Sequence, residues 1–397
     1  MKSIDQVDLR SKRVFIRCDF NVPTDDQGNI TDDTRIRAHL RTIGYAVDKD
    51  AKVILASHMG RPKGKRNDKY SLEQVALRLS ELTGKPVTFL DDCVGERVEK
   101  AVSAMKGGDL ILLENLRFYI GEEKNDEEFA KQLARFCDVY VDDAFAVSHR
   151  AAASNTAITG LVKECAAGFL LKDEINYFNK AMSNPARPLV AIIGGAKVSD
   201  KIGVLEKVIE KVDKLIVGGA MAFTFLKASG YEVGKSKCEE DMLDTAKGIM
   251  AKAKERGVSF MLPVDSVIAE QPSADSHTKV CGIKDIPKDW MGLDIGPETI
   301  KLFSDAVQDT GTIVWNGPLG MFEFEPFSKG TFSVAHAVAN SGALTIVGGG
   351  DTDTAIHQAG ESSKISYIST GGGAFLELLE GKTLPGVVSL EACGGNT

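Results

Sequence analysis

The sequence lacks both a surplus of positive charge and a long apolar run. Its formal net charge is −8, with 48 Lys and Arg against 56 Asp and Glu. Proteins that bind nucleic acid through the phosphate backbone normally carry a basic surplus, so this class is disfavoured. No stretch reaches the roughly 18 apolar residues of a membrane span, and Met1 to Phe20 lacks the apolar core of a signal peptide. We therefore expect a cytoplasmic protein without nucleic-acid or membrane partners.

The cysteines lack the patterns that would give them a structural role. All seven are widely scattered, their number is odd, and none belongs to a CxxC pair. Disulfide-rich scaffolds and zinc sites use closely spaced cysteines, so the sequence indicates neither. We expect all seven to be reduced residues that fill space in the interior.

Two familiar nucleotide-binding signatures are also absent. Neither half has a GxGxxG motif after its first predicted strand, which weakens the interpretation as a Rossmann-type dehydrogenase. The segment Gly230 to Ser236 resembles a Walker A loop, but only three residues separate its glycines and no clear strand precedes it. A P-loop needs the longer loop between a strand and a helix, so we reject this match.

Arginine and glycine are unevenly distributed along the chain. Thirteen of the fifteen arginines precede residue 151, whereas all but one of the Gly-Gly clusters follow it. Guanidinium groups bind small carboxylates and phosphates bidentately, and glycine turns at helix N-termini let backbone amides approach the phosphates of a nucleotide. The sequence therefore predicts a two-substrate enzyme that binds one anion in each half.

Length and hydrophobic pattern predict two α/β domains. The chain has 397 residues, and at about 150 residues per domain two domains are the natural expectation. Short apolar runs followed by helix-length stretches are typical of doubly wound, Rossmann-like parallel sheets. The predicted strands are 14–17, 53–56, 110–113, 139–141, 189–193, 214–217, 258–262, 312–315, 344–347 and 365–369. Four strands of the second half end in glycine or Asn-Gly, and these ends point to one ligand crevice.

A helix is predicted between the two halves. Apolar residues recur at helical spacing through 168–182, and Asn184-Pro185 then ends the pattern. We expect a connecting hinge helix at 169–184 between domains at 1–168 and 185–383. A helix inside one larger domain is the alternative that the sequence leaves open.

The segment that follows the first predicted strand carries a distinctive motif. Asp19 and Asn21 face one side of an extended chain, and Pro23 then directs the chain outward. This segment, Arg17 to Pro23, resembles the signature of the phosphoglycerate kinase family. Further family motifs follow in chain order at Ser57 to Pro62, Glu114 to Phe118, Asp143 to Phe145, His149-Arg150, Gly194 to Lys201, Trp315 to Pro318, Gly348 to Thr352 and Gly371 to Gly373. The resemblance extends over essentially the whole chain.

The resemblance implies that the N-terminal half binds 3-phosphoglycerate. The matching positions are Asp19, Asn21, Arg35, His58, Arg61, Arg117 and Arg150. The set suits this ligand, since guanidinium groups can hold its phosphate and carboxylate while Asp19 and Asn21 meet its hydroxyl. For a lone arginine a solvated surface position would be the better interpretation, and without the motif His58 could equally be a structural loop histidine.

The resemblance implies that the C-terminal half binds Mg-ADP or Mg-ATP. The matching positions are Lys197, Lys201, Gly219, Gly292, Asn316, Pro318, Glu323, Gly349, Gly350, Asp351 and Thr352. Asp351 is the expected magnesium contact, because Mg²⁺ keeps several waters and needs only one or two carboxylates beside the nucleotide phosphates. Glu323 taken alone is better interpreted as a solvated acidic residue.

The implied reaction is reversible phosphoryl transfer between 1,3-bisphosphoglycerate and ADP, giving 3-phosphoglycerate and ATP. The resemblance assigns the catalytic work to Arg35 from one half and to Lys197, Gly372 and Gly373 from the other, in a hinge-bending monomer that transfers the group in line on domain closure. It also implies that residues 384–397 return onto the first domain. A non-catalytic nucleotide- or anion-binding protein on the same fold is the alternative, but it would be expected to lose Lys197, Asp351 or the Gly371 cluster.

Three positions depart from the family pattern. Ala146-Val147-Ser148 stands before His149 where Gly-Thr-Ala is usual, and a lost glycine matters if the loop needs a positive φ. Ala220 replaces a frequent glycine, and Asp353 replaces an apolar residue close to the expected phosphate site. An extra carboxylate there would repel phosphates. If this protein differs from the family in function, we therefore expect the difference in its affinity for the nucleotide.

Overall fold

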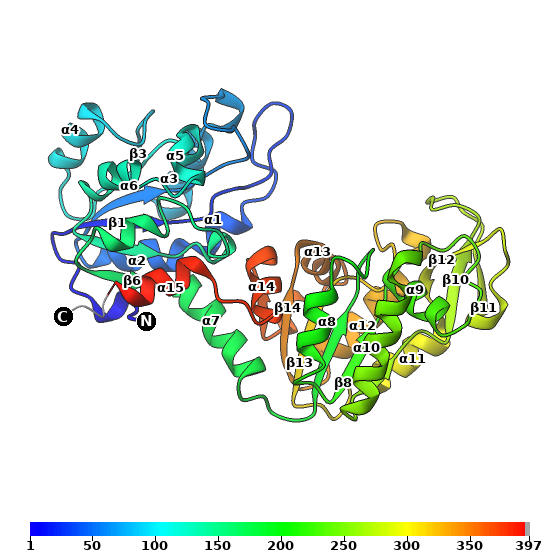
Figure 1. Ribbon diagram of the computed structural model, residues 1–397. Helices are drawn as coiled ribbons and strands as arrows, with labels where there is room; N and C mark the ends of the chain where they lie inside the picture. Colours follow the sequence, from blue (N-terminus) through cyan, green and yellow to red (C-terminus); the bar gives the residue numbers. More distant parts are fainter. Residues whose placement is uncertain (394–397) are drawn as a thin grey trace. The chain divides into compact units, whose positions relative to one another are not determined.

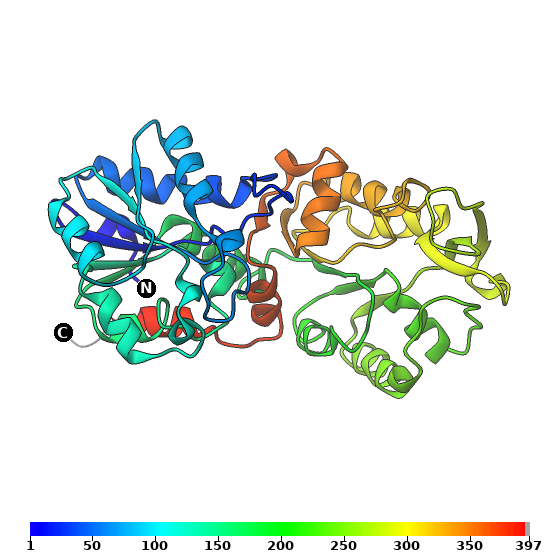
Figure 2. The same cartoon turned by 90° about the horizontal axis from the view of Figure 1, so that it is seen from above.

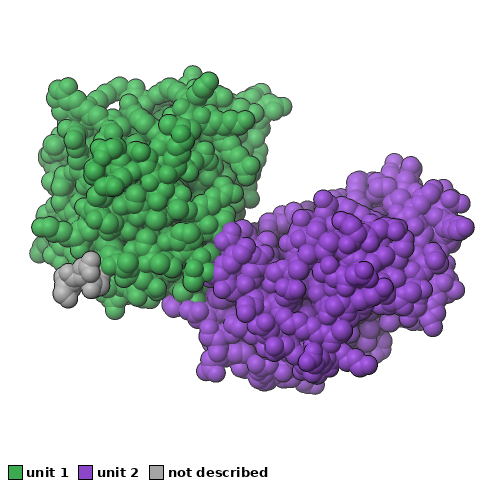
Figure 3. Space-filling view, in the orientation of Figure 1, with its two compact units in different colours: residues 1–175, 383–397 green, residues 176–382 purple. Residues whose placement is uncertain are grey.

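The computed structural model describes residues 1–393, which form two compact units (Figure 3). Unit 1 comprises Met1–Ile175 and the segment that begins at Thr383, and unit 2 comprises Asn176–Lys382. Each unit contains a six-stranded parallel sheet, and Figure 2 shows helices on both sides of each sheet. The predicted doubly wound α/β class is thereby confirmed. No helix within residues 1–393 is long and apolar enough to cross a membrane.

The sheet of unit 1 has the strand order β3-β4-β2-β1-β5-β6. Its strands β1, β3 and β6 are labelled in Figure 1. Its strands are β1 Arg13–Arg17, β2 Lys52–Ala56, β3 Val87–Phe89, β4 Leu110–Leu112, β5 Val139–Asp142 and β6 Cys165–Ala167. Its helices are α1 Thr34–Ala38, α2 Leu40–Asp48, α3 Glu73–Thr83, α4 Glu96–Ala104, α5 Ile120–Glu123, α6 Glu127–Ala134 and the C-terminal α15 Pro385–Ala392. Strand β1 lies between β2 and β5, so the loop that carries Asp19 leaves the middle of the sheet at its carboxyl edge.

The parallel sheet of unit 2 has the order β15-β14-β13-β7-β8-β9. Its strands are β7 Leu189–Ile193, β8 Lys214–Val217, β9 Ser259–Met261, β13 Thr312–Asn316, β14 Leu344–Gly348 and β15 Tyr367–Ser369. The helices are α8 Ile202–Val208, α9 Met221–Ala228, α10 Leu243–Glu255, α11 Pro297–Ala306, α12 Lys329–Ala339, α13 Gly350–Gln358 and α14 Gly372–Leu379. The strand order reverses direction between β7 and β13, and ligands of open parallel sheets bind beyond the carboxyl ends at such a point.

Unit 2 also holds a three-stranded antiparallel sheet that the sequence analysis did not predict. Its strands are β10 Asp265–Ala269, β11 Lys279–Gly282 and β12 Met291–Ile295, in the order β11-β10-β12. Strand β11 begins with two exposed residues and has no fully buried one, so its sequence gives no continuous apolar run. Strand β12 carries Gly292, one of the positions expected to contact a nucleotide.

Helix α7 covers Phe169–Met182, and the division between the two units falls within it. Its N-terminus is held by side chains of unit 1. The Phe169 amide donates to Thr42 Oγ1 at 2.9 Å, and the Leu170 amide donates to Asp143 Oδ1 at 2.9 Å. Side-chain acceptors therefore satisfy amide groups that the first turn of a helix leaves without partners.

The expectation that all seven cysteines are reduced is wrong for one pair. Cys165 in β6 and Cys393 after α15 form a disulfide with a Cα–Cα distance of 5.9 Å, although 228 residues separate them in the sequence. The pairing depends on the return of α15 to unit 1, where the Gly386 amide donates to the Ser148 carbonyl at 2.9 Å. Spacing alone cannot predict such a pair. We expected residues 384–397 to return onto the first domain. Residues 384–393 belong to unit 1, and residues 394–397 lie outside the described part of the chain.

Candidate active site

The loop after β1 places Asp19 and Asn21 at the carboxyl edge of the unit 1 sheet. Asp19 Oδ1 accepts from the Asn21 amide at 3.2 Å, and Asn21 Oδ1 accepts from the Gly60 amide at 2.8 Å. Gly60 follows the next strand and has a φ of +60°, and a Cβ atom there would overlap the Tyr70 ring. The two loops are therefore joined at a position that favours glycine.

Arg35 in α1 reaches the same loop. Its Nη1 atom lies 2.6 Å from Asp19 Oδ2, and the Arg35 side chain is 39% exposed while that of Asp19 is 7% exposed. Burial raises the pKa of Asp19, but His58 and the positive charges of Arg35 and Arg17 lower it, and the net pKa lies below the usual value. Asp19 is thus an ionised anchor for Arg35 at neutral pH.

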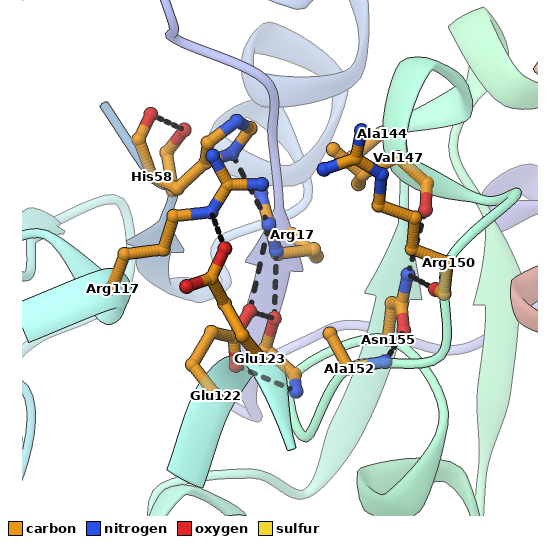
Figure 4. Close-up of polar contacts among 12 residues, drawn as sticks. Arg17, His58, Arg117, Glu122, Glu123, Ala144, Val147, Arg150, Ala152 and Asn155 are labelled. Carbon is orange, nitrogen blue, oxygen red and sulfur yellow. Dashed lines mark hydrogen bonds and ion pairs between the residues drawn. The ribbon is translucent and has the colours of Figure 1, made fainter. Parts of the chain in front are cut away.

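His58 follows β2 and is packed against Arg17 (Figure 4). Arg17 Nη2 lies 3.3 Å from His58 Nδ1, and because arginine only donates, Nδ1 is the acceptor and Nε2 carries the proton. Burial lowers the pKa of His58 well below 6.5, and the nearby arginines act in the same direction against the charge of Asp19. A neutral His58 can therefore offer one N–H group to a ligand.

Arg17 is itself buried and makes a hydrogen bond and an ion pair with other side chains of unit 1. Its Nε donates to Ser154 Oγ at 2.8 Å, and its Nη2 lies 3.6 Å from Glu122 Oε1 (Figure 4). Ser154 in turn donates to Glu122 at 2.6 Å. This network fixes the guanidinium group that orients His58, and neither Glu122 nor Ser154 was identified from the sequence, because their roles depend on contacts more than 100 residues away from Arg17.

Arg117 lies in a short 3₁₀ helix after β4 and is 8% exposed. Its Nη1 donates to the Gly60 carbonyl at 2.7 Å, and its Nε lies 3.4 Å from Glu123 (Figure 4). Burial lowers the pKa of Arg117, and repulsion from Arg17 and Arg150 lowers it further against the opposing charge of Glu123. Arg117 is thus a largely buried cation that pairs with Glu123 and also lies near two further arginines, a position that an added anion would stabilise.

Arg150 and Arg61 are exposed in unit 1. The loop of Arg150 is held by Asn155, whose Nδ2 donates to the carbonyls of Val147 at 3.1 Å and Arg150 at 2.9 Å (Figure 4). Ala146 is not among the residues with positive φ, so the glycine that is usual there is not needed for the backbone of this loop. Within residues 1–393, Arg61 makes no hydrogen bond or ion pair with the other predicted residues of unit 1.

Unit 2 contains a cavity of about 410 Å³ at the carboxyl ends of its strands. Five residues predicted from the sequence line it, namely Gly219, Gly292, Pro318, Glu323 and Asp351. Apolar side chains supply much of the wall, among them Phe223, Met291 and Leu319. A mainly apolar cavity with a few polar groups is typical of a site for a small molecule such as a nucleotide.

Glycine is required at two positions in this wall. Gly219 has a φ of +68°, and a Cβ atom there would lie 2.7 Å from the Gly195 amide nitrogen. A Cβ atom at Gly292 would overlap the Phe223 ring. Ala220, the departure from the family pattern, has a φ of −62°, so an alanine is tolerated there without strain.

Asn316, at the end of β13, organises the polar side of the site. Lys201 Nζ donates to Asn316 Oδ1, and Asn316 Nδ2 donates to the Gly348 carbonyl at 2.7 Å. Thr352 Oγ1 accepts from the Gly317 amide at 2.7 Å. Burial lowers the pKa of Lys201 against the opposing charges of Asp200, Asp351 and Glu380. Lys201, Asn316 and Thr352 thus form a cluster beside the cavity, although they do not line it.

Two helices of unit 2 begin in glycine. Gly349, with a φ of +99°, precedes α13, and Gly371 precedes α14, whose first residues are Gly372 and Gly373. The first amides of a helix have no partners within it and favour an anion. Asp351 and Asp353 both lie in the first turn of α13, and only Asp351 is among the residues that line the cavity.

Lys197 is exposed in the loop between β7 and α8, and Glu239 fixes that loop. Glu239 Oε2 accepts from the amides of Val198 at 2.6 Å and Ser199 at 3.2 Å. Asp294 in β12 lines the cavity, and burial raises its pKa to about 7. Neither acidic residue was identified from the sequence, because their hydrogen bonds to the amides of Val198, Ser199 and Gly330 join residues at least 36 positions apart.

The fold and these two sites define a class of enzyme, a phosphotransferase with an arginine-rich site in one unit and a glycine-rich cavity in the other. The family model described as phosphoglycerate kinase matches residues 4–382. The phosphoglycerate kinases of Citrifermentans bemidjiense and Geotalea uraniireducens are each 62% identical to the chain over 395 residues, which is 99% of both sequences. The chain belongs to the phosphoglycerate kinase family.

Solved structures agree with this assignment. The structure of phosphoglycerate kinase from Coxiella burnetii has a TM-score of 0.91 at 45% identity and covers 98% of both chains. The enzyme from Pyrococcus horikoshii OT3 has a TM-score of 0.84 at 30% identity over 100% of both chains. The chain is therefore a glycolytic kinase, a phosphotransferase with a carboxyl group as acceptor, and neither a dehydrogenase nor a non-catalytic binding protein is favoured.

Proposed function

We propose that unit 1 binds 3-phosphoglycerate and unit 2 binds Mg-ADP or Mg-ATP, with the phosphoryl group moving directly between them. The observation that carries the assignment of unit 1 is the largely buried Arg117, which is held by the Gly60 carbonyl and Glu123 and lies near Arg17 and Arg150, whose charges oppose its own. The ligand phosphate and carboxylate would relieve this repulsion. Arg61 adds a further exposed cation, and His58, Asp19 and Asn21 supply the donor and acceptors that a hydroxyl-bearing ligand needs.

In unit 2 we place the base and ribose of the nucleotide in the cavity and its phosphates beside α13. Gly219, Gly292 and Pro318 form the wall, and Glu323 would accept from the ribose hydroxyls. The amides of Gly350 and Thr352, together with Gly349 and the Lys201–Asn316 pair, would meet the phosphates. Asp353 lies in the same first turn, and its negative charge would weaken phosphate binding.

Mg²⁺ fits the donors that this site provides. Within residues 1–393 no group of three or more His, Cys, Asp and Glu side chains could hold a metal ion, but Asp351 lines the cavity at the N-terminus of α13. A hard cation that keeps its waters can be held by one carboxylate and the nucleotide phosphates. Mg²⁺ would neutralise charge on the transferring phosphates, and Asp351 would orient it.

The transfer itself needs no covalent enzyme intermediate. A carboxylate oxygen of 3-phosphoglycerate attacks the γ-phosphorus of ATP, and the bond to the ADP oxygen breaks. Arg35 from unit 1 and Lys197 with the amides of Gly372 and Gly373 from unit 2 would stabilise the charge on the moving phosphoryl oxygens. Because these groups belong to different units, we propose that the chain is a monomer that closes around both substrates.

The proposed closure involves two domains and a hinge helix. We assign residues 1–168 and 384–397 to the 3-phosphoglycerate domain, 169–184 to a hinge helix and 185–383 to the nucleotide domain, in a cytoplasmic protein with small-molecule substrates only. Small-angle scattering should show compaction only when 3-phosphoglycerate and a nucleotide are both present. An unchanged radius of gyration with both substrates bound would contradict hinge closure.

The function is tested by trapping the acyl phosphate product with hydroxylamine. Purified protein is incubated with Mg-ATP and 3-phosphoglycerate, and two controls omit magnesium or replace the substrate with glycerate. We expect trapped product only when magnesium, ATP and the phosphate group of the substrate are all present. Absence of product despite binding of both ligands would contradict the proposal.

A further inference from the structure

His39 is a buried histidine that neither the family motifs nor the proposed mechanism uses. It lies between α1 and α2 and is 1% exposed. Its Nδ1 atom lies 2.8 Å from Asp143 Oδ2, and its Nε2 atom lies 2.9 Å from the backbone amide nitrogen of Asp19. The Phe20 ring also packs against it in a T-shaped arrangement, with 5.4 Å between ring centroids.

The two partners determine which nitrogen of His39 carries the proton. A carboxylate at Asp143 accepts hydrogen bonds, and the Asp19 amide can only donate one. His39 therefore donates from Nδ1 to Asp143 and accepts at Nε2 from Asp19. Both ring nitrogens are used, and the ring connects a buried carboxylate to the main chain of the loop after β1.

Asp143 is fixed from its other side by the start of helix α7. Its Oδ1 atom accepts from the amides of Leu170 at 2.9 Å and Leu171 at 3.4 Å. A carboxylate at a helix N-terminus is stabilised by the helix dipole as well as by these bonds. A Cβ atom at Gly168 would overlap the Asp143 carboxylate, so the close approach requires glycine there.

A continuous series of contacts within unit 1 therefore runs from the first turn of α7 to Arg35. It passes through Asp143, the His39 ring, the Asp19 amide and the Asp19 carboxylate, which lies 2.6 Å from Arg35 Nη1. We propose that His39 is a positioning residue for phosphoryl transfer, which fixes the main chain at Asp19 so that the Asp19 carboxylate holds Arg35 in its reactive position. This inference rests on the proposed role of Arg35.

Two conservative variants separate the two hydrogen bonds of His39. His39→Gln can place an amide oxygen where Nε2 accepts from Asp19, whereas His39→Asn can place an amide N–H group where Nδ1 donates to Asp143. We expect His39→Asn to lower kcat about tenfold or more while the Kd for ADP is unchanged, since small misplacements of catalytic groups reduce rates strongly. His39→Gln should retain kcat within about threefold.

A spectroscopic measurement distinguishes positioning from a general structural role. The amide proton and nitrogen resonances of Asp19 should shift in His39→Asn and remain near their wild-type values in His39→Gln, while amides of β4 are unchanged in both. A wild-type kcat for His39→Asn would overturn the proposal. Equal losses of kcat in the two variants would also overturn it, because the Asp19 bond would then not be the one that matters.

A double-mutant cycle tests whether His39 acts through Arg35. In a background of Arg35→Ala, the change His39→Asn should have almost no further effect on kcat, because residues that act as a unit are not additive. Full additivity would overturn the proposal. A wild-type kcat for Arg35→Ala alone would instead refute the proposed role of Arg35, so failure of the underlying function and failure of the inference give different results.

Discussion

Arg35 Nη1 lies 2.6 Å from Asp19 Oδ2 in an ion pair whose acidic partner is buried and whose basic partner is half-exposed. The pair uses one terminal nitrogen of a guanidinium group that has five N–H donors. Asp19 thus restrains Arg35 without using all of its donors. This arrangement suits a residue that meets charge developing on a phosphoryl group.

Replacement of Arg35 by alanine should therefore affect catalysis much more than nucleotide binding. We expect kcat to fall by about 10³-fold with the Kd for ADP almost unchanged. Arg37→Ala is a matched control, since Arg37 lies in the same helix and pairs with Asp33 at 2.8 Å. Steady-state kinetics and calorimetry measure the two effects. Loss of ADP binding in Arg35→Ala would show that the substrates are assigned to the wrong units.

The low pKa of His58 predicts an effect of pH on stability. Folded His58 remains neutral below pH 6.5, whereas the unfolded chain takes up a proton as the pH falls through about 6.5. The unfolded state then binds more protons, so the free energy of unfolding falls with decreasing pH, by up to about 1.4 kcal/mol per pH unit for this group.

The comparison of wild type with His58→Asn isolates this contribution. Urea unfolding between about pH 7 and about pH 5.5 should show a steeper loss of stability in the wild type, because asparagine does not titrate. The two curves should run closer to parallel above about pH 7. Parallel curves over the whole range would mean that the pKa of His58 is the same in the folded and unfolded protein, which would contradict the lowered pKa.

The wall of the cavity predicts different results for two glycine substitutions. Gly219→Ala and Gly230→Ala both place alanine at a positive φ, of +68° and +93°, and each should lower stability by about 1 kcal/mol or more. At Gly219 the new Cβ atom would also contact Gly195, whereas nothing lies within 4 Å of a Cβ atom at Gly230. Only Gly219→Ala should raise the Kd for ADP, by about tenfold. Equal Kd values would place the nucleotide elsewhere.

The disulfide predicts the number of thiols that react in the denatured protein. Cys165 and Cys393 are paired and five cysteines are free, so unreduced protein should titrate with five thiols. After reduction all seven cysteines should react. Cys393→Ser, which cannot form this bond, should give the same number of thiols before and after reduction. Seven reactive thiols in unreduced wild-type protein would contradict the pairing.

The central strands could be predicted from the sequence because they are buried on both faces. Strand β5, for example, is buried at all four positions and forms an apolar run that ends in Asp142. Strand β3 has three residues, none of them fully buried, at the edge of its sheet, so it gave no such signal. The antiparallel sheet was missed for the same reason at β11.

Similarity to family motifs predicted which residues belong to the candidate site, but not how they contact one another. The family resemblance identified Gly219 and Asp351, which line the cavity, but not the contacts that orient the candidate side chains. Arg17 and His58 are 41 residues apart, and Glu122 approaches Ser154 from 32 residues away. Such contacts depend on the order of strands in the sheet, which a local pattern does not contain.

The most direct test of the account is a calorimetric comparison of two variants with both ligands. Arg117→Ala removes a buried cation of unit 1, and Lys201→Ala removes the partner of Asn316 in unit 2. We predict that Arg117→Ala weakens 3-phosphoglycerate binding and leaves the Kd for Mg-ADP unchanged, while Lys201→Ala does the reverse. Weakened binding of Mg-ADP by Arg117→Ala, with 3-phosphoglycerate binding intact, would contradict the assignment of one substrate to each unit.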